Sequence, residues 1–315
     1  MAKVAVIGAG LIGRAWAISF ARAGHEVTLA DSAPAALDKA MAFVESVLPD
    51  LARYDLLEGQ SAAEVRKRIT TTGDLASALA DVAHVQENAP EKLEVKKALF
   101  PELDRMAPPD AVLASSTSAL LPSAFTASVK GRARCLVVHP INPPYLVPAV
   151  EVVPAPWTDP AVVARAADFM RKAGQAPIVM KREIDGFVMN RMQGALLQEA
   201  FRLVADGFAS VEDVDVGLRE GLALRWSFMG PFETIDLNAP EGVRDYVIRY
   251  KGIYERLAPS QMRMVEWAGP ALDEIERDRR KRLKRDELGK RSIWRDRRLM
   301  ALAQHKRRAA KDIGD

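Results

Sequence analysis

Short apolar runs alternate with amphipathic stretches through the first 180 residues of the chain. The runs are four or five residues long, as buried strands are, and cover residues 3–7, 27–30, 82–86, 111–114, 134–138, 150–153 and 176–180. Helices are expected from Leu11 onward and over 35–57, 61–68, 91–106 and 159–173. Strands that alternate with helices are typical of a doubly wound, mostly parallel sheet, so the pattern predicts an α/β domain of Rossmann type.

Beyond residue 181 the strand signals stop. Residues 186–207 predict one long helix, and further helices follow with breaks at Gly230-Pro231 and Ala239-Pro240. We therefore expect two domains, an α/β domain over 1–183 and an all-helical domain over 184–315. Ligands commonly bind between such domains.

A glycine-rich turn joins the first predicted strand to the first predicted helix. It has the form G-x-G-x-x-G, and Asp31 ends the next strand eighteen residues after the last glycine. One glycine permits the tight turn, one lets a pyrophosphate approach the backbone, and one lets the helix pack on the strand. In this context the motif predicts a dinucleotide site, and the candidate cofactor-binding residues are Gly8, Gly10, Leu11, Ile12, Gly13 and Asp31.

Asp31 indicates which dinucleotide is bound. A carboxylate at this place can accept both ribose hydroxyls of NAD, but it repels the additional phosphate of NADP. The next residues, Ser32-Ala33-Pro34, supply no arginine to hold that phosphate. The sequence therefore predicts NAD as the cofactor.

Composition narrows the class of protein. Of the 315 residues 49% are hydrophobic and 28% charged, as expected for a globular protein, and no apolar stretch is long enough to span a bilayer. The single cysteine, Cys135, excludes an internal disulfide framework and suits a reducing cytoplasm. Glycines and Arg14 interrupt the apolar N-terminal region, which argues against a signal peptide.

The net charge is only +3, but residues 273–311 carry sixteen Lys and Arg against seven Asp and Glu. Spaced pairs such as Glu276/Arg280 and Asp278/Arg282 predict a solvated helix, with an apolar side formed by Ile275, Leu283, Leu288, Ile293, Trp294, Leu299 and Leu302. Nucleic-acid binding is the alternative, but Trp294 is the only aromatic residue in the segment. A surface or dimer-clasping helix is the favoured interpretation.

Two residues suggest acid–base chemistry. His139 ends a predicted strand, and Glu151 lies twelve residues on, at the start of the next one. A strand–loop–strand arrangement can bring them together, so that the carboxylate fixes the tautomer of the imidazole and the second ring nitrogen takes a proton. Oxidation of an alcohol by NAD needs such a base. The alternative is an ordinary hydrogen-bonded histidine at a strand end.

Ser118 and Asn190 are further candidates for substrate contacts. Ser118 follows a strand at its carboxyl end, where open α/β sheets bind ligands, and Asn190 lies early in the long helix. A turn-forming serine and an exposed polar helix residue are the alternatives. No metal site is expected.

Several segments of the chain together resemble the 3-hydroxyacyl-CoA dehydrogenase family in order and spacing, and the likeness covers nearly all of residues 1–250. They are Gly8–Gly13 with Asp31, Ser115–Ser118, His139–Pro143, Glu151 and Gly186–Arg191. The resemblance implies that His139 is the general acid/base and Glu151 its partner, and that Ser118 and Asn190 hold the substrate oxygen. It also implies a homodimer formed through the helical domain, and cofactor contacts by Glu91, Lys96 and Asn142.

Within the family the chain is most similar to the λ-crystallin/L-gulonate 3-dehydrogenase branch. The segments that carry this likeness are Gly10–Trp16, Gln86–Glu91, Ser115–Ser118 and Gly230–Ala239. The L-carnitine dehydrogenases come second and share Leu224–Gly230, but they tend to carry Asp where this chain has Asn190.

A free hydroxy acid, unlike a CoA thioester, needs a cation for its carboxylate. Arg225 is the expected clamp and Arg191 the runner-up, whereas an Arg paired with a helix acid is the alternative. The sequence thus predicts NAD-dependent oxidation of a small L-3-hydroxy acid, with L-gulonate, oxidised to 3-dehydro-L-gulonate, as the first candidate. L-carnitine and 3-hydroxyacyl-CoA are alternative substrates, and a structural, crystallin-like protein is the non-enzymatic alternative.

Overall fold

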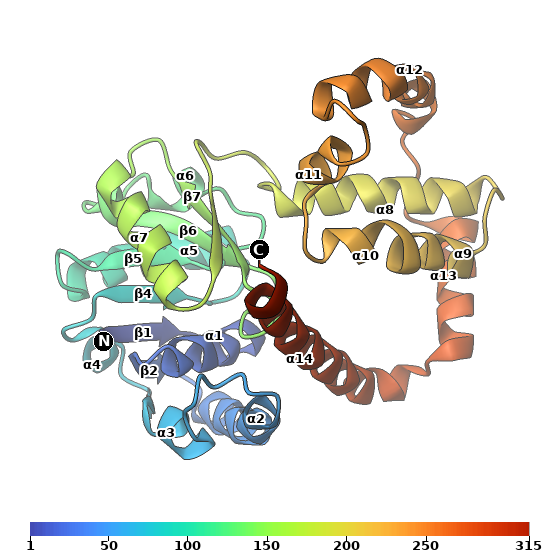
Figure 1. Ribbon diagram of the computed structural model, residues 1–315. Coiled ribbons are helices and arrows are strands. Elements are labelled where there is room, and N and C mark those ends of the chain that lie inside the picture. The colour runs from blue at the N-terminus through green and yellow to red at the C-terminus, as the bar shows by residue number, and fades with distance from the viewer. Residues whose placement is uncertain (315) are drawn as a thin grey trace. The chain divides into compact units, whose positions relative to one another are not determined.

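The computed structural model describes residues 1–314 and divides the chain into two compact units (Figure 1). The first unit comprises residues 1–189 together with the stretch from Ile293 onward, and the second comprises residues 190–292. The expected division put everything from residue 184 in the helical domain. The structure differs because the chain returns to the α/β unit with its last helix.

The first unit is built on an eight-stranded sheet of order β3-β2-β1-β4-β5-β6-β7-β8. Every neighbouring pair is parallel except β6 and β7, which are antiparallel. The expected doubly wound, mostly parallel sheet is therefore confirmed. Its strands are β1 (Lys3–Ile7), β2 (Glu26–Ala30), β3 (Ile69–Thr72), β4 (His84–Glu87), β5 (Val112–Ser115), β6 (Cys135–Pro140), β7 (Ala149–Pro154) and β8 (Ala176–Val179).

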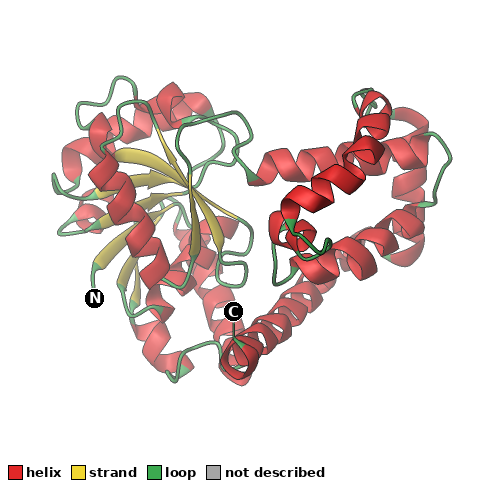
Figure 2. Ribbon diagram, turned by 45° about the horizontal axis from the view of Figure 1, so that its top comes forward, coloured by secondary structure: helices red, strands yellow, loops and turns green. Residues whose placement is uncertain are grey.

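Helices cover both faces of this sheet (Figure 2). They are α1 (Leu11–Arg22), α2 (Pro34–Arg53), α3 (Ala62–Lys67), α4 (Leu75–Leu79), α5 (Leu93–Met106), α6 (Pro122–Thr126) and α7 (Pro160–Lys172). Successive strand residues point to opposite faces, so the core divides in two. Val4 and Val6 pack in one cluster with α1, α2 and α7, whereas Ala5 and Ile7 pack in the other with α4, α5 and α6.

Cys135 lies fully buried at the start of β6. Burial, with a smaller contribution from Asp104, raises the pKa of its thiol to about 12. The thiol is therefore protonated at neutral pH, as expected for an inert buried cysteine.

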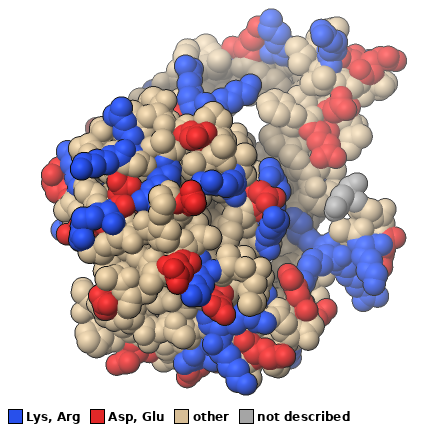
Figure 3. Space-filling model, turned by 90° about the vertical axis from the view of Figure 1, so that its left-hand side faces the viewer, with Lys and Arg blue, Asp and Glu red and all other residues tan. Residues whose placement is uncertain are grey.

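The last helix, α14 (Leu288–Ile313), adds to the first core cluster. Met300 is only 2% exposed there, with Leu299 and Ala303 packed around it. Ile293 and Trp294, which were expected on the apolar side, are instead 56% and 46% exposed. On the face of the molecule drawn in Figure 3, acidic and basic side chains are interspersed rather than separated.

The second unit is entirely helical over the residues described. It contains α8 (Met189–Ala205), whose first residue belongs to the first unit, α9 (Val211–Val216), a π-helical turn (Gly217–Leu222), α10 (Ala223–Trp226), α11 (Pro231–Asp236), α12 (Val243–Gln261), α13 (Gly269–Arg282) and a short 3₁₀ turn (Arg285–Glu287). The breaks expected at Gly230-Pro231 and Ala239-Pro240 fall on either side of α11. Asp278 pairs with Arg282 as expected, but Glu276 pairs with Arg285 rather than Arg280. Within residues 1–314, none of the helices combines the length and apolar character that crossing a membrane requires.

Candidate active site

The glycine turn between β1 and α1 is built as its spacing indicates. Gly8 has a φ of +96°, and a Cβ there would lie 2.7 Å from the carbonyl oxygen of Asn88. A Cβ on Gly13 would lie 1.8 Å from the carbonyl oxygen of Gly8, so the helix and the turn touch through backbone alone. At Gly10 a Cβ would meet nothing within 4 Å. The turn is thus open at its middle glycine, and α1 begins at the next residue with free N–H groups.

A cavity of about 440 Å³ lies beside this turn. Asp31 stands in its wall, where Oδ2 accepts from the Ala9 N–H at 2.8 Å and Oδ1 from the Ala33 N–H at 2.9 Å. The other lining residues are Ile7, Gly8, Gly10, Ala30, Ser32, Gly73, Leu75, Asn88, Ala89, Pro90 and Leu99, none of them a cation. A fixed carboxylate without a neighbouring cation suits the ribose hydroxyls of NAD and disfavours a 2′-phosphate.

We predict that Asp31→Ser shifts the cofactor preference toward NADP. The substitution removes the charge that repels the 2′-phosphate, and hydrogen bonds to a charged group are worth about 1.5–3 kcal/mol. The ratio of kcat/KM for NAD to that for NADP should therefore fall about tenfold or more. Steady-state kinetics with both cofactors measures this ratio. An undiminished ratio would show that Asp31 does not select the cofactor. Asp31→Asn, which keeps the shape without the charge, should lower the ratio in the same direction.

Glu91, expected as a cofactor contact, organises the turn after β5. Its Oε1 accepts from the Thr117 hydroxyl at 2.5 Å. The same oxygen accepts from the backbone N–H groups of Ser118 and Ala119, both at 3.0 Å. Ser118 is thereby held just after the carboxyl end of β5, and it is exposed to solvent. This is a suitable place for a substrate contact, whereas a contact between Glu91 and the cofactor stays a prediction.

Lys96, also expected to contact the cofactor, is buried in an ion pair with Glu87. Its side chain is 1% exposed, and its Nζ lies 3.0 and 2.9 Å from the two carboxylate oxygens. Glu87 also accepts from the Ser115 hydroxyl and from the Ala89 N–H. Sequence reasoning missed Glu87, although an acid that ends a buried strand is itself a signal that a cationic partner is needed.

Lys96→Met should destabilise the first unit strongly. The substitution leaves the Glu87 carboxylate buried and uncompensated, which costs about 3–5 kcal/mol. Chemical denaturation measures the loss, and Lys97→Met, at an exposed position with a single ion pair, is the control. A loss no greater than in that control contradicts the assignment, whereas the double variant Lys96→Met/Glu87→Leu should recover most of the stability.

His139 and Glu151 face each other across β6 and β7. They are directly paired in the antiparallel register, and His139 Nδ1 lies 2.7 Å from Glu151 Oε2. The two residues are 3% and 0% exposed. A carboxylate only accepts hydrogen bonds, so Nδ1 must carry a proton and Nε2 of the neutral ring is the basic nitrogen. The structure thus brings together the acid–base pair that the sequence predicts.

Glu151 is itself fixed by the segment before α8. Its Oε1 accepts from the N–H groups of Val188 and Met189 at 2.6 and 2.8 Å. The positive φ angles of Gly186 and Phe187, 75° and 51°, turn the chain so that these two N–H groups converge. The long helix expected from residue 186 therefore begins at Met189, and its N-terminus stabilises the carboxylate.

Phe187 lies next to His139 in space, and Asn142 lies three residues after it in the sequence. Phe187 is fully buried, and its ring centroid lies 5.6 Å from that of His139. Asn142 follows shortly after, and its amide oxygen is buried without a hydrogen-bond partner among the described residues. Such an orphaned acceptor fits an amide donor such as the carboxamide of nicotinamide.

The remaining predicted residues belong to the second unit. Asn190 and Arg191 lie in the first turn of α8, directly after Met189. Arg225 is exposed in α10, where it donates to the side-chain oxygen of Asn238 at 3.5 Å, and it forms no ion pair with any described residue. The alternative of an Arg paired with a helix acid is therefore not what the structure shows. Residues 1–314 also contain no group of three or more His, Cys, Asp or Glu side chains that could hold a metal ion.

Comparison with known proteins identifies the family of the chain. Residues 3–184 match the NAD-binding domain of 3-hydroxyacyl-CoA dehydrogenase, and residues 186–270 match its C-terminal domain. A λ-crystallin homolog from Bos taurus is 42% identical over 96% of this chain and 95% of its own length. An L-carnitine dehydrogenase from Streptomyces coelicolor is 43% identical over 79% of this chain and 77% of its own length.

A solved structure is also similar over nearly the whole chain. It is that of 5-formyl-3-hydroxy-2-methylpyridine 4-carboxylic acid 5-dehydrogenase, an NAD⁺-dependent dismutase. The TM-score is 0.82 at 25% identity, with 96% of this chain and 97% of that chain covered. The family matches and the intact dinucleotide turn show that the chain belongs to the 3-hydroxyacyl-CoA dehydrogenase family and is an NAD-dependent oxidoreductase.

Proposed function

We propose that the chain oxidises the 3-hydroxyl group of a small L-3-hydroxy acid, with L-gulonate as the first candidate substrate. The observation that carries this proposal is the buried His139–Glu151 pair in an NAD-dependent scaffold. Two similar proteins are named for small molecules without a CoA group, L-carnitine and a pyridine carboxylic acid. This supports a free acid over a thioester.

NAD supplies the hydride acceptor when it is bound, held by the Gly8–Gly13 turn and Asp31. His139 takes the proton of the substrate hydroxyl at Nε2. The charge that forms on the imidazole is stabilised by the Glu151 carboxylate at 2.7 Å, and the burial of both residues strengthens this interaction. Ser118 and Asn190 are proposed to hold the reacting oxygen.

Arg225 is proposed as the clamp for the substrate carboxylate. It stands in the short helix α10 with no carboxylate partner of its own in the part of the chain described, so its charge is available to a ligand. Arg191 is the second candidate. A bidentate Arg–carboxylate contact accounts for recognition of a free acid, which a CoA thioester does not present.

Arg225→Ala should raise KM for every active free acid. Loss of a charged contact costs about 2–5 kcal/mol, which corresponds to about 30-fold or more in KM. Initial-rate kinetics measures the change, with Arg219→Ala as the control because Arg219 pairs with Glu212 and Glu220 on the surface. A rise below about threefold would exclude the clamp, and Arg191→Ala then tests the runner-up.

The substrate class is tested by one screen of NAD reduction. The purified protein is offered L-gulonate, L-carnitine, L-3-hydroxybutyrate and 3-hydroxybutyryl-CoA. We expect the highest kcat/KM with L-gulonate. A preference for the thioester would overturn the choice of substrate while leaving the proposed acid–base pair in place.

We also propose that the protein works as a homodimer formed through the second unit, in the cytoplasm. The second unit exposes large apolar side chains, among them Phe228 at 69%, Phe232 at 80%, Leu237 at 68% and Ile248 at 82%. No residue of α12 or α13 is buried within the chain. Apolar surface of this kind is usually covered by a partner, and a second copy is the partner that the family resemblance implies.

A further inference from the structure

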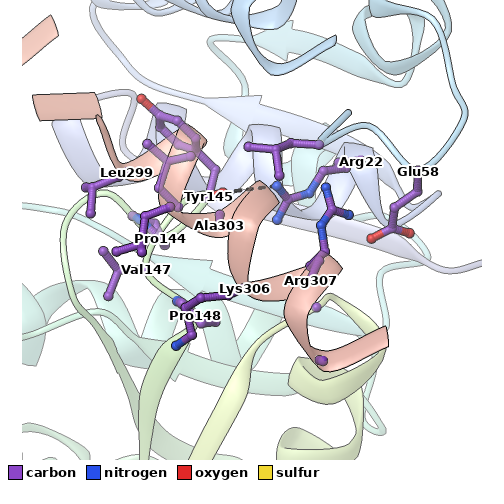
Figure 4. A pocket seen from close by; sticks show the side chains of 15 residues that line it. Arg22, Glu58, Pro144, Tyr145, Val147, Pro148, Leu299, Ala303, Lys306 and Arg307 are labelled. Atoms are coloured by element: carbon purple, nitrogen blue, oxygen red, sulfur yellow. Dashed lines mark hydrogen bonds between the residues drawn. The ribbon is translucent and has the colours of Figure 1, made fainter. Parts of the chain in front are cut away.

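A second cavity, of about 480 Å³, lies within the first unit between α14 and the connection from β6 to β7 (Figure 4). It shares no lining residue with the cavity beside the glycine turn. Leu56, Tyr145 and Leu146 contribute buried apolar surface, and Leu299, Leu302 and Ala303 of α14 face them. One part of its wall is therefore suited to an apolar ligand.

The other part of the wall is cationic. Arg22, Lys306 and Arg307 line it, against a single acid, Glu58. Arg22 is half-buried and donates to the carbonyl oxygen of Tyr145 at 3.0 Å. In Figure 4 the Arg22 and Arg307 side chains extend toward each other, with the Glu58 carboxylate to one side.

The close approach of these like charges is electrostatically unfavourable. Burial lowers the pKa of Arg22, Glu58 raises it, and the nearby charge of Arg307 lowers it further. One carboxylate faces three cations, so the cavity carries an excess positive charge beside an apolar wall. An anion placed between the two guanidinium groups relieves the repulsion and accepts hydrogen bonds from both.

We propose that this cavity binds a small amphipathic anion, with its apolar part against Leu146 and Leu302 and its carboxylate or phosphate between Arg22 and Arg307. The wall at residues 144–148 belongs to the connection between the strands that carry His139 and Glu151. The occupant therefore contacts the segment that joins the two halves of the acid–base pair. Its binding does not depend on the identity of the substrate.

Isothermal titration of the full chain, saturated with NAD, tests this proposal. The probes are decanoate and decyl phosphate. Decanol is the control for the alkyl group without a charge, and inorganic phosphate is the control for the anionic group without an alkyl group. We expect one site per chain for both anions, and at least tenfold weaker binding of decanol and of phosphate. From hexanoate through octanoate to decanoate, each methylene should tighten binding about fourfold. The tighter of the two ten-carbon anions identifies the preferred headgroup.

Substitutions at two exposed positions of α14 test whether the anion binds in this cavity. Arg307→Gln should weaken decanoate binding at least tenfold, and Leu302→Asp should abolish it by placing a carboxylate in the cavity. Arg308→Gln, one residue away but outside this lining, and Arg225→Ala, in the other unit, should leave binding unchanged. Thermal unfolding checks that each variant is folded. The proposal is overturned if no anion binds, if Arg307→Gln and Leu302→Asp bind as the unmodified chain does, or if either control weakens binding equally.

Discussion

Replacing His139 with glutamine should lower kcat by a factor of about 10²–10⁴, the usual contribution of a positioned general base. Glutamine has a similar length, and its amide can still donate to the Glu151 carboxylate, so the pair of strands keeps its hydrogen bond. It cannot take the hydroxyl proton, because an amide nitrogen is not basic. Steady-state kinetics with the best substrate of the screen measures the loss.

Cofactor binding and folding should be untouched by this change. The glycine turn joins β1 to α1, and Asp31 directly follows β2. The carboxylate of Asp31 accepts from the N–H groups of Ala9 and Ala33 and not from His139. Fluorescence titration with NADH and thermal unfolding supply the controls. A folded His139→Gln protein that binds NADH and keeps the original kcat would remove the proposed acid–base role.

Replacing Glu151 with glutamine should cost a similar amount through the tautomer of His139. The glutamine oxygen can accept from Val188 and Met189, as Oε1 of the carboxylate does at 2.6 and 2.8 Å. Its NH₂ group then faces Nδ1 of His139, which must become the acceptor and leave the proton on Nε2. The ring can no longer take a proton at the reactive nitrogen, and an equivalent change in the Ser-His-Asp template costs about 10⁴ in kcat.

The tautomer can be observed directly. Nitrogen chemical shifts of the His139 ring should report a proton on Nδ1 in the unmodified chain and on Nε2 in Glu151→Gln. Glu183→Gln, which alters another carboxylate that accepts from a backbone N–H, is the matched control. If Glu151→Gln keeps kcat within a factor of about three, the carboxylate does not set the state of the imidazole.

Much of the first unit follows from hydrophobic pattern, because buried parallel strands read as apolar runs. The strand at Ile69–Thr72 was not predicted, because it is not an apolar run. Three of its four residues are threonine, and it lies at the edge of the sheet, where little burial is required. The burial of Met300 in the core of the first unit was not predicted either, because the pattern of a helix does not show which unit the helix packs on.

The contact between His139 and Glu151 could be predicted from the sequence, but the hydrogen bonds that fix Glu151 from the other side could not. Two strands joined by a short connection can pair antiparallel, and this places His139 opposite Glu151. The additional hydrogen bonds from Val188 and Met189 could not be predicted. They depend on left-handed backbone at Gly186 and Phe187, whereas the apolar Phe187 and Val188 continue the helical pattern and conceal the turn.

The buried Lys96–Glu87 pair shows a different limit. A resemblance can suggest that a lysine contacts the cofactor, but only the structure shows that its ammonium lies between a strand-end carboxylate and the backbone. Glu87 then supports Ser115, the residue from which the Ser118 turn starts. Residues that act through others in this way leave little trace in a motif.

Competition between a free hydroxy acid and a CoA thioester shows which of the two substrate classes the enzyme oxidises. The enzyme is given NAD and equal concentrations of L-gulonate and 3-hydroxybutyryl-CoA, and both oxidised products are quantified by mass spectrometry. We expect 3-dehydro-L-gulonate, or its decarboxylation product, to exceed 3-oxobutyryl-CoA at least tenfold. An excess of 3-oxobutyryl-CoA would contradict it.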